Sequence, residues 1–200
     1  MYLFIGGGTV GTNAARVALG MGACVIIADI NVNRLRYLTD ILEGKLVTMV
    51  LNKSNLEALV ADADLVVGAT LKPGAKADKL VTRDMLAKMR KGSVLVDVAI
   101  DQGGCCETFR TTTHDHPIFT VDGVLHYCVT NMPAAVSRSS TFALTNATFP
   151  YVLKLAEIGY KEALKTDTAL RKGLNVYQCK LVYEPVAKSL GLQYTSLEIF

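Results

Sequence analysis

The sequence lacks the features that place a chain in a membrane or send it across one. No apolar run approaches the roughly 20 residues that a membrane-spanning helix needs. No basic segment followed by an apolar one precedes the first glycines. We therefore expect a cytoplasmic protein that is not bound to a membrane.

Clusters of like charge are also missing. The 21 lysines and arginines and the 18 acidic residues give a net charge of +3, spread along the chain. Basic clusters interleaved with aromatic residues are typical of nucleic-acid binding, and the sequence has none. We expect no nucleic-acid partner. We also find no internal repeat and no low-complexity segment.

The cysteines exclude a disulfide framework. There are five, an odd number, and none are in C-x-x-C spacing. This usage is typical of reduced thiols in a cytosolic protein and not of a zinc site. The five are Cys24, Cys105, Cys106, Cys128 and Cys179.

What the sequence does have is apolar character and glycine. Hydrophobic residues make up 50% of the 200 residues, and the mean hydropathy is +0.31. Such values are typical of parallel strands that are buried on both faces. They are also compatible with a surface that meets another domain or subunit.

A glycine-rich turn stands near the start of the chain. The apolar run 1–5 predicts a buried strand, and Gly6, Gly8 and Gly11 follow it in the spacing G-x-G-x-x-G. The first glycine permits a tight turn, the second lets a pyrophosphate approach the backbone, and the third lets the next helix pack closely. Residues 12–21 predict that helix, whose amino end would present free N–H groups to phosphates.

An acidic residue completes this pattern. Residues 24–28 predict a second strand, and Asp29 ends it, 18 residues after Gly11, where an acid can bind an adenosine ribose. A glycine triplet alone is equally compatible with an ordinary turn and an acid that caps the next helix. Because strand, helix, second strand and acid occur in register, we favour dinucleotide binding.

The chain continues in alternating units, which predict an α/β fold with a Rossmann-type doubly wound parallel sheet and a C-terminal helical segment. We place the nucleotide-binding domain at 1–137 and the helical segment at 138–200. Within that segment, residues 138–164 are mostly helical, and Pro150 either kinks the helix or starts a new one. Further strands are predicted at 46–51, 65–69, 94–100 and 124–130, and further helices at 31–42, 55–61 and 83–89.

Polar residues follow the predicted strand 94–100. Strand alternation would place Asp97, Ala99 and Asp101 on one face, with Asp101 nearest the ligand crevice. A carboxylate there can orient a water, accept a proton or stabilise positive charge, or it can merely brace the turn. Position alone leaves both hypotheses open for Asp101. We interpret Asp97, inside the strand, as a structural carboxylate.

Other polar residues occur in neighbouring loops. Asn131 offers a donor and an acceptor that could fix a carboxamide, and Met132 offers an apolar wall. Lys76 and Lys79 are predicted to be solvated lysines. His114 and His116 raise a metal hypothesis, but no third ligand has a plausible spacing, so we predict a polar loop and no metal.

Four segments of the sequence closely resemble the alanine dehydrogenase family, which shares an NAD-binding superfamily with the proton-translocating transhydrogenases. These segments are GGGTVGTNAARVALGMGA, VVGATLKPGAKADKLVT, SVLVDVAIDQGGCCET and HYCVTNMPAAVSRSSTFALTNATFPYVLKLA. The uninterrupted AIDQGG and the NMP segment resemble alanine dehydrogenase more than a transhydrogenase domain. Five residues depart from the family pattern: Lys72, Asp78, Phe109, Thr111 and Thr130.

The resemblance implies a role for individual positions. Asp101 matches the catalytic aspartate, Asp29 the ribose-binding acid and Arg34 the basic residue after it. The remaining positions that match cofactor-binding segments are Gly6, Gly8, Thr9, Val10, Gly11, Thr70, Leu71, Val98, Ala99, Ile100, Arg110, Val129, Thr130, Asn131 and Met132.

The resemblance also implies a function. It implies that NAD takes a hydride from L-alanine, and that the resulting imine gives pyruvate and ammonia. In the family, a substrate domain precedes the glycine turn, so we expect this chain to be the cofactor half, inactive without an N-terminal part. Family members are hexamers, so self-association is expected. The alternatives are a stand-alone or regulatory NAD(H)-binding module without catalysis, or a transhydrogenase-like NAD(H)-binding domain.

Apolar residues near the C-terminus support self-association. They stand in a stretch with no strand–helix repeat and no evident domain to cover them, which predicts exposed apolar surface. These residues are Leu181, Val182, Tyr183, Val186, Leu190, Leu192 and Ile199.

Overall fold

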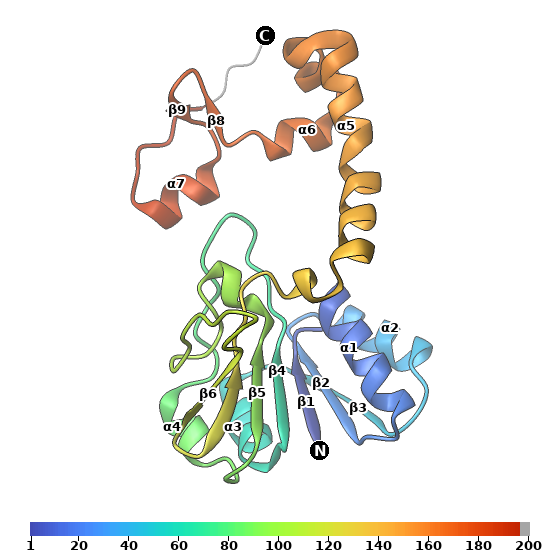
Figure 1. The fold of residues 1–200 in the computed structure, drawn as a ribbon, viewed down its shortest axis with the longest axis vertical. Helices are drawn as coiled ribbons and strands as arrows, with labels where there is room; N and C mark the ends of the chain where they lie inside the picture. Colours follow the sequence, from blue (N-terminus) through green and yellow to red (C-terminus); the bar gives the residue numbers. More distant parts are fainter. Residues whose placement is uncertain (197–200) are drawn as a thin grey trace. The chain divides into compact units, whose positions relative to one another are not determined.

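A computed structural model describes residues 1–196 of the chain (Figure 1). It divides into two compact units, residues 1–72 with 76–132, and residues 73–75 with the part from Pro133 onward. The first unit contains, in order, β1 (Tyr2–Ile5), α1 (Thr9–Gly20), β2 (Val25–Asp29), α2 (Val32–Ile41), β3 (Leu46–Val50), α3 (Lys53–Asp62), β4 (Leu65–Gly68), α4 (Arg83–Ala87), β5 (Val94–Asp97), the 3-10 helix η1 (Val98–Gln102), β6 (Ile118–Val121) and β7 (Val124–Tyr127). The domain boundary at residue 137 stays a prediction.

One seven-stranded sheet organises the first unit. Its strand order is β3-β2-β1-β4-β5-β7-β6, and neighbouring strands are parallel except for the pair β6–β7. The order reverses between β1 and β4, which is the switch point where doubly wound sheets bind ligands. The predicted α/β fold is confirmed.

Side-chain alternation along the central strands divides the core between the two faces of the sheet. On β1, Leu3 and Ile5 pack with α3 and α4 in one cluster of buried side chains. Phe4 points to the other face and packs with α1 and α2. Figure 1 shows these helix pairs on opposite sides of the sheet. Burial on both faces explains the high apolar content of the sequence.

The fifth strand ends earlier than the sequence predicts. β5 stops at Asp97, and residues 98–102 form η1. The buried Asp97 carboxylate accepts hydrogen bonds from the backbone N–H groups of Cys105 at 2.8 Å and Cys106 at 3.2 Å. These bonds pull the following chain back over the strand end. The prediction that Asp97, Ala99 and Asp101 share one strand face is therefore wrong, whereas a structural Asp97 agrees with these contacts.

A hairpin replaces the single sixth strand of the prediction. β7 ends at Tyr127 instead of continuing to 130, and β6 pairs with it in antiparallel register. Asp122 and Gly123 connect the two strands with positive φ angles of 52° and 85°. Two left-handed residues form the turn type that matches the twist of a hairpin, and Asp-Gly is a preferred pair for it.

The second unit is mainly helical. η2 (Met132–Val136) begins at the last residue of the first unit, and α5 (Ser137–Thr166), α6 (Thr168–Gly173), β8 (Val176–Tyr177), β9 (Lys180–Leu181) and α7 (Glu184–Leu190) follow it. Pro150 lies inside α5, and the backbone leaves helical geometry at Gly159 instead, with φ 73° and ψ 159°. The kink or new helix start predicted at Pro150 is therefore not found there, and the break is at Gly159.

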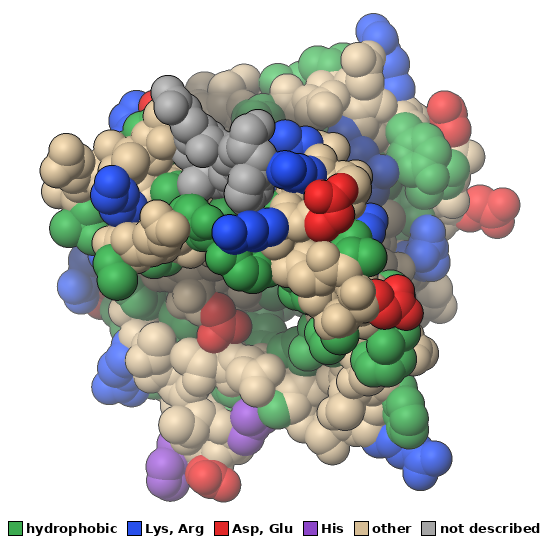
Figure 2. All heavy atoms as spheres, turned by 90° about the horizontal axis from the view of Figure 1, so that it is seen from above, with side chains coloured by type: hydrophobic (Ala, Val, Ile, Leu, Met, Phe, Trp, Pro, Cys, Tyr) green, Lys and Arg blue, Asp and Glu red, His purple; other side chains and the backbone are tan. Residues whose placement is uncertain are grey.

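Large apolar side chains are exposed along α5. Phe142, Leu144, Phe149 and Val152 are each more than half exposed. Figure 2 shows hydrophobic side chains (green) reaching the surface at several places between charged ones. Near the C-terminus, Leu190 and Leu192 are exposed as predicted. Leu181, Val182, Tyr183 and Val186 are half-buried, and Ile199 lies outside the described residues. Among residues 1–196, no helix is long and apolar enough to cross a membrane.

Candidate functional site

The three glycines of the turn after β1 each meet a different requirement. Gly6 has φ 104°, and a Cβ there would lie 2.6 Å from the carbonyl oxygen of Ala69. A Cβ at Gly11 would lie 1.9 Å from the carbonyl oxygen of Gly6. Gly8, the residue that caps α1, has no atom within 4 Å of a Cβ position. The open space at Gly8, beside the free N–H groups of a helix, fits a bound pyrophosphate.

Asp29 stands at the end of β2, beside this turn. One carboxylate oxygen accepts the Gly7 N–H at 2.6 Å, and the other accepts the Asn31 N–H at 2.8 Å. The side chain therefore holds the turn against the strand end. A carboxylate can accept about four hydrogen bonds, so both oxygens keep capacity for ribose hydroxyls.

The side chain of Arg34 binds the protein's own turn. Its Nε donates to the Gly7 carbonyl at 2.6 Å, and its Nη2 donates to the Thr12 hydroxyl at 2.9 Å. Thr12 in turn donates to the Gly7 carbonyl at 3.0 Å. Arg34 thus braces the glycine turn from outside the cavity described next.

A cavity of about 480 Å³ opens beside the glycine turn and Asp29. It lies beyond the carboxyl ends of β1, β2 and β4, at the switch point of the sheet. The Thr70 hydroxyl is buried without a hydrogen-bond partner, so a ligand could supply one. The cavity is lined by Gly6, Gly8, Asp29, Ile30, Leu51, Ala69, Thr70, Leu71, Lys72, Ala77, Asp78 and Leu80. These observations fit an adenine dinucleotide.

A second group of predicted residues meets beyond β5 and β7. The Asn131 backbone N–H donates to both oxygens of the Asp101 carboxylate, at 3.2 and 3.3 Å. Asn131 itself has φ 52°, the left-handed conformation that asparagine tolerates. Its carbonyl is 3.1 Å from His114 Nε2. The structure therefore brings Asp101, Asn131 and His114 together.

The other predicted cofactor residues fall into three places. Thr9 and Val10 begin α1, and Val98, Ala99 and Ile100 precede Asp101 in η1. The guanidinium of Arg110 lies 4.5 Å from the centre of the Phe119 ring. The segment 129–132 follows β7, where Val129 is buried and Thr130 N–H donates to Thr112 at 3.1 Å.

Lys79 is exposed, as predicted for a solvated lysine, and it also has partners within the protein. Its ammonium donates to the carbonyls of Gly103 and Gly104, the latter at 2.8 Å, and lies 3.5 Å from the centre of the Phe109 ring. Burial lowers the pKa of Lys79, and the nearby Asp97 carboxylate opposes that effect. Lys79 thus fixes the turn that follows Asp101.

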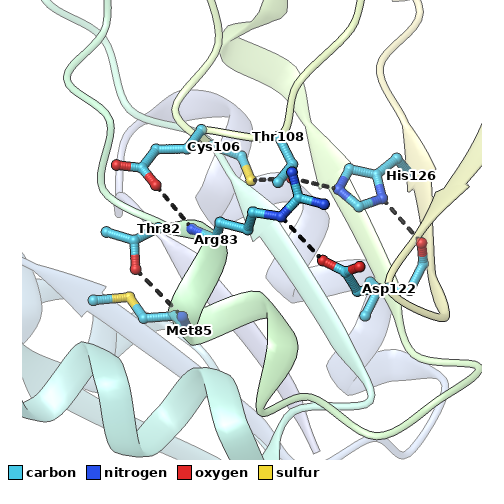
Figure 3. A network of polar contacts seen from close by, with 9 residues as sticks. Thr82, Arg83, Met85, Cys106, Thr108, Asp122 and His126 are labelled. Carbon is cyan, nitrogen blue, oxygen red and sulfur yellow. Dashed lines mark hydrogen bonds and ion pairs between the residues drawn. The ribbon is translucent and has the colours of Figure 1, made fainter.

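Sequence reasoning missed His126, a buried histidine of β7 (Figure 3). Its ring connects this strand to the segment that contains Cys106 and Thr108. His126 Nδ1 lies 3.0 Å from the Val124 carbonyl, which can only accept, so Nδ1 carries the proton. In the neutral ring Nε2 then accepts from the Thr108 hydroxyl at 2.9 Å, and Thr108 is 3.1 Å from the Cys106 sulfur. Burial lowers the pKa of His126. Figure 3 also shows Arg83 beside Asp122 of the hairpin, 3.3 Å away.

Comparison with known proteins gives consistent matches. The family described as "Alanine dehydrogenase/PNT, C-terminal domain" matches residues 1–184. The chain is 55% identical over 190 residues to an alanine dehydrogenase from Halomonas elongata, covering 95% of this chain and 51% of that protein. It is 54% identical over 197 residues to one from Methanococcus maripaludis, covering 98% and 53%.

Solved structures agree with these matches. An L-alanine dehydrogenase superposes with a TM-score of 0.83 at 49% identity, over 95% of this chain and 52% of that one. A transhydrogenase from Sinorhizobium meliloti superposes with a TM-score of 0.71 at 22% identity, over 92% and 49%, and shares the fold. The chain spans about half the length of the relatives it matches.

Proposed function

Because the chain belongs to the alanine dehydrogenase/PNT C-terminal domain family, we propose that it is the NAD-binding half of an L-alanine dehydrogenase. The domain and the related alanine dehydrogenases are NAD-dependent, which confirms the prediction of the cofactor. The transhydrogenase-like alternative is less well supported, since that neighbour is only 22% identical. The single observation that carries the proposal is the family match over residues 1–184, which includes the glycine turn, Asp29 and Asp101.

In this proposal, the first unit holds the dinucleotide at the cavity beside β1. The open space at Gly8 receives the pyrophosphate, and the amino end of the 12-residue α1 contributes its N–H groups and dipole. Asp29 accepts from the ribose hydroxyls. Arg34 and Thr12 keep the turn in the shape that this requires.

Asp101 is proposed as the catalytic residue. Bound NAD would supply the hydride acceptor for oxidation of L-alanine at Cα, giving an imine that water converts to pyruvate and ammonia. The Asp101 carboxylate, held by the Asn131 N–H, could orient that water and stabilise the positive charge of the imine. This role is supported by the family match and by the position of Asp101 just beyond β5.

We propose that catalysis also needs an N-terminal substrate domain. The chain covers about half of each related dehydrogenase, which supports this division. Homo-oligomerisation, hexameric by family, and a cytoplasmic location stay predictions.

One assay tests the proposal and its main alternative. Alanine-dependent NADH production should be absent with this chain alone and should appear when the N-terminal half of a related alanine dehydrogenase is supplied. Asp101→Asn in the same mixture is the matched control and should lower the rate by about 10²–10⁴-fold. NADH binding without activity in any mixture would instead support a stand-alone or regulatory module.

A further inference from the structure

Two charged side chains form an ion pair in the wall of the cofactor cavity. Lys72 Nζ donates to the Asp78 carboxylate, at 2.9 Å to Oδ1 and 3.2 Å to Oδ2. Both residues line the cavity that Gly8 and Asp29 also line.

The charges around the cavity single out Lys72. Of the residues that line it, Asp29 and Asp78 are acidic, and Lys72 alone is basic. Arg34, which sequence reasoning proposed for this site, is bound to Gly7 and Thr12. A dinucleotide carries phosphates, which the two carboxylates repel. Lys72 is thus the one side-chain cation of the lining that can offset this repulsion.

The geometry leaves Lys72 able to bind a second partner. An ammonium group carries three N–H donors, and one carboxylate does not use all of them. The side chain is 54% exposed, so water molecules on the ammonium can be exchanged for phosphate oxygens. The partnerless Thr70 hydroxyl lies in the same wall, two positions earlier in the chain.

We propose that Lys72 is a phosphate-binding residue of this site. Asp78 holds the Lys72 ammonium at the cavity wall and weakens its electrostatic attraction for phosphate. The proposal rests on the assignment of the cavity to an adenine dinucleotide. The ligand group is a phosphoryl oxygen, which either the pyrophosphate or a ribose 2′-phosphate could provide.

The two halves of the pair should have opposite effects on binding. Lys72→Met removes the cation and should weaken the binding of NADPH, and of NADH as well if the pyrophosphate is the group bound, about two- to five-fold, the range of a solvent-exposed charge pair. Asp78→Asn frees the ammonium and should strengthen binding by a similar factor. Higher salt should shrink both effects, because they are electrostatic. A pair that only braced the loop would weaken binding in both variants.

The experiment is a calorimetric titration of the full chain and its variants with four ligands. NADH and ADP-ribose contain the pyrophosphate, NADPH adds the 2′-phosphate, and adenosine has neither. Adenosine affinity should stay unchanged in every variant. If Lys72→Met lowers the affinity for NADH, NADPH and ADP-ribose equally, Lys72 binds the pyrophosphate. If it lowers only the affinity for NADPH, Lys72 binds the 2′-phosphate.

Lys76→Met is the matched control, since it removes the same charge from the same loop at a residue outside the cavity lining. If Lys72→Met binds neither NADH nor NADPH more weakly than Lys76→Met does, or if Asp78→Asn also weakens binding, the proposal is wrong. These results leave the NAD assignment intact as long as the wild-type chain binds NADH. A wild-type chain that binds no NADH overturns the assignment, and this proposal with it.

Discussion

The backbone N–H of Asn131 points at the Asp101 carboxylate, 3.2 and 3.3 Å from its two oxygens. The two residues follow different strands, β5 and β7, which are neighbours in the sheet. The bond therefore joins the two loops that extend beyond these strand ends. It holds the carboxylate through a main-chain group, so of the possible substitutions at Asn131 only proline removes the donor itself.

Asp101→Asn tests the catalytic assignment. The variant keeps the shape of the side chain but loses its charge and its ability to accept a proton. Turnover in the reconstituted enzyme should fall by about 10²–10⁴-fold, while NADH affinity stays within a few-fold. Steady-state rates, NADH titration and thermal unfolding on the same variant check this. If turnover stays near normal, or falls only with the folded fraction, Asp101 is a structural residue.

Asp29 should make the site prefer NADH to NADPH. A 2′-phosphate would lie beside its carboxylate, and the two anions repel. Arg34 donates from Nε and Nη2 to Gly7 and Thr12, so only its remaining N–H groups can offset this repulsion. We expect NADH to bind at least about ten-fold more tightly, or about 1.4 kcal/mol. Equal affinities in a fluorescence titration would refute the role given to Asp29.

His126 should make the protein less stable in mild acid. Burial lowers its pKa below the ordinary value of 6.5, so below that pH the unfolded chain takes up a proton that the folded chain does not. The free energy of unfolding should therefore fall as the pH drops from about 7 through 6.5. Urea unfolding of wild type and His126→Gln at several pH values isolates this effect.

The His126→Gln variant should be less stable than wild type at pH 7. The difference between their free energies of unfolding should become smaller as the pH falls. His116→Gln, the same substitution at an exposed position, is the control for the loss of a histidine. If the difference in unfolding free energy between wild type and His126→Gln is the same at every pH, the buried ring is not the group responsible for the pH dependence.

The exposed apolar side chains of α5 predict self-association. Phe142 and Leu144 are 59% and 66% exposed, and exposed apolar surface of this kind is usually covered by another chain or domain. We expect dimers or larger species, or poor solubility. Sedimentation at micromolar concentration checks this, and a highly soluble monomer would contradict it. Leu144→Glu should shift the distribution toward smaller species.

The first part of the fold could be predicted because its signals are local. Buried apolar runs, a glycine triplet and an acid at a strand end are all visible within residues 1–29, and the structure places them as expected. The Asp-Gly pair at 122–123, between two apolar runs, was a local hairpin signal that the prediction overlooked.

The remaining features depend on contacts between distant residues. β5 ends at Asp97 because its carboxylate binds N–H groups eight and nine residues further along the chain. Lys79 is held by carbonyls 24 and 25 residues away. His126 is buried only in the folded chain, where Thr108, 18 residues earlier in the sequence, is hydrogen-bonded to its ring. No short sequence pattern encodes these partners.

The most direct test of the central claim is an NADH titration of three proteins: wild type, Gly8→Ala and Gly11→Ala. Gly8 has φ −69° and open space at its Cβ position, so alanine should fold normally there and obstruct only the ligand. Alanine at Gly11 would clash with Gly6 and should lower the melting temperature. We predict saturable binding to wild type and, for a fully folded Gly8→Ala, affinity lower by about ten-fold, or about 1.4 kcal/mol. Absence of NADH binding to the folded wild-type chain, or equal binding to Gly8→Ala, would contradict the account.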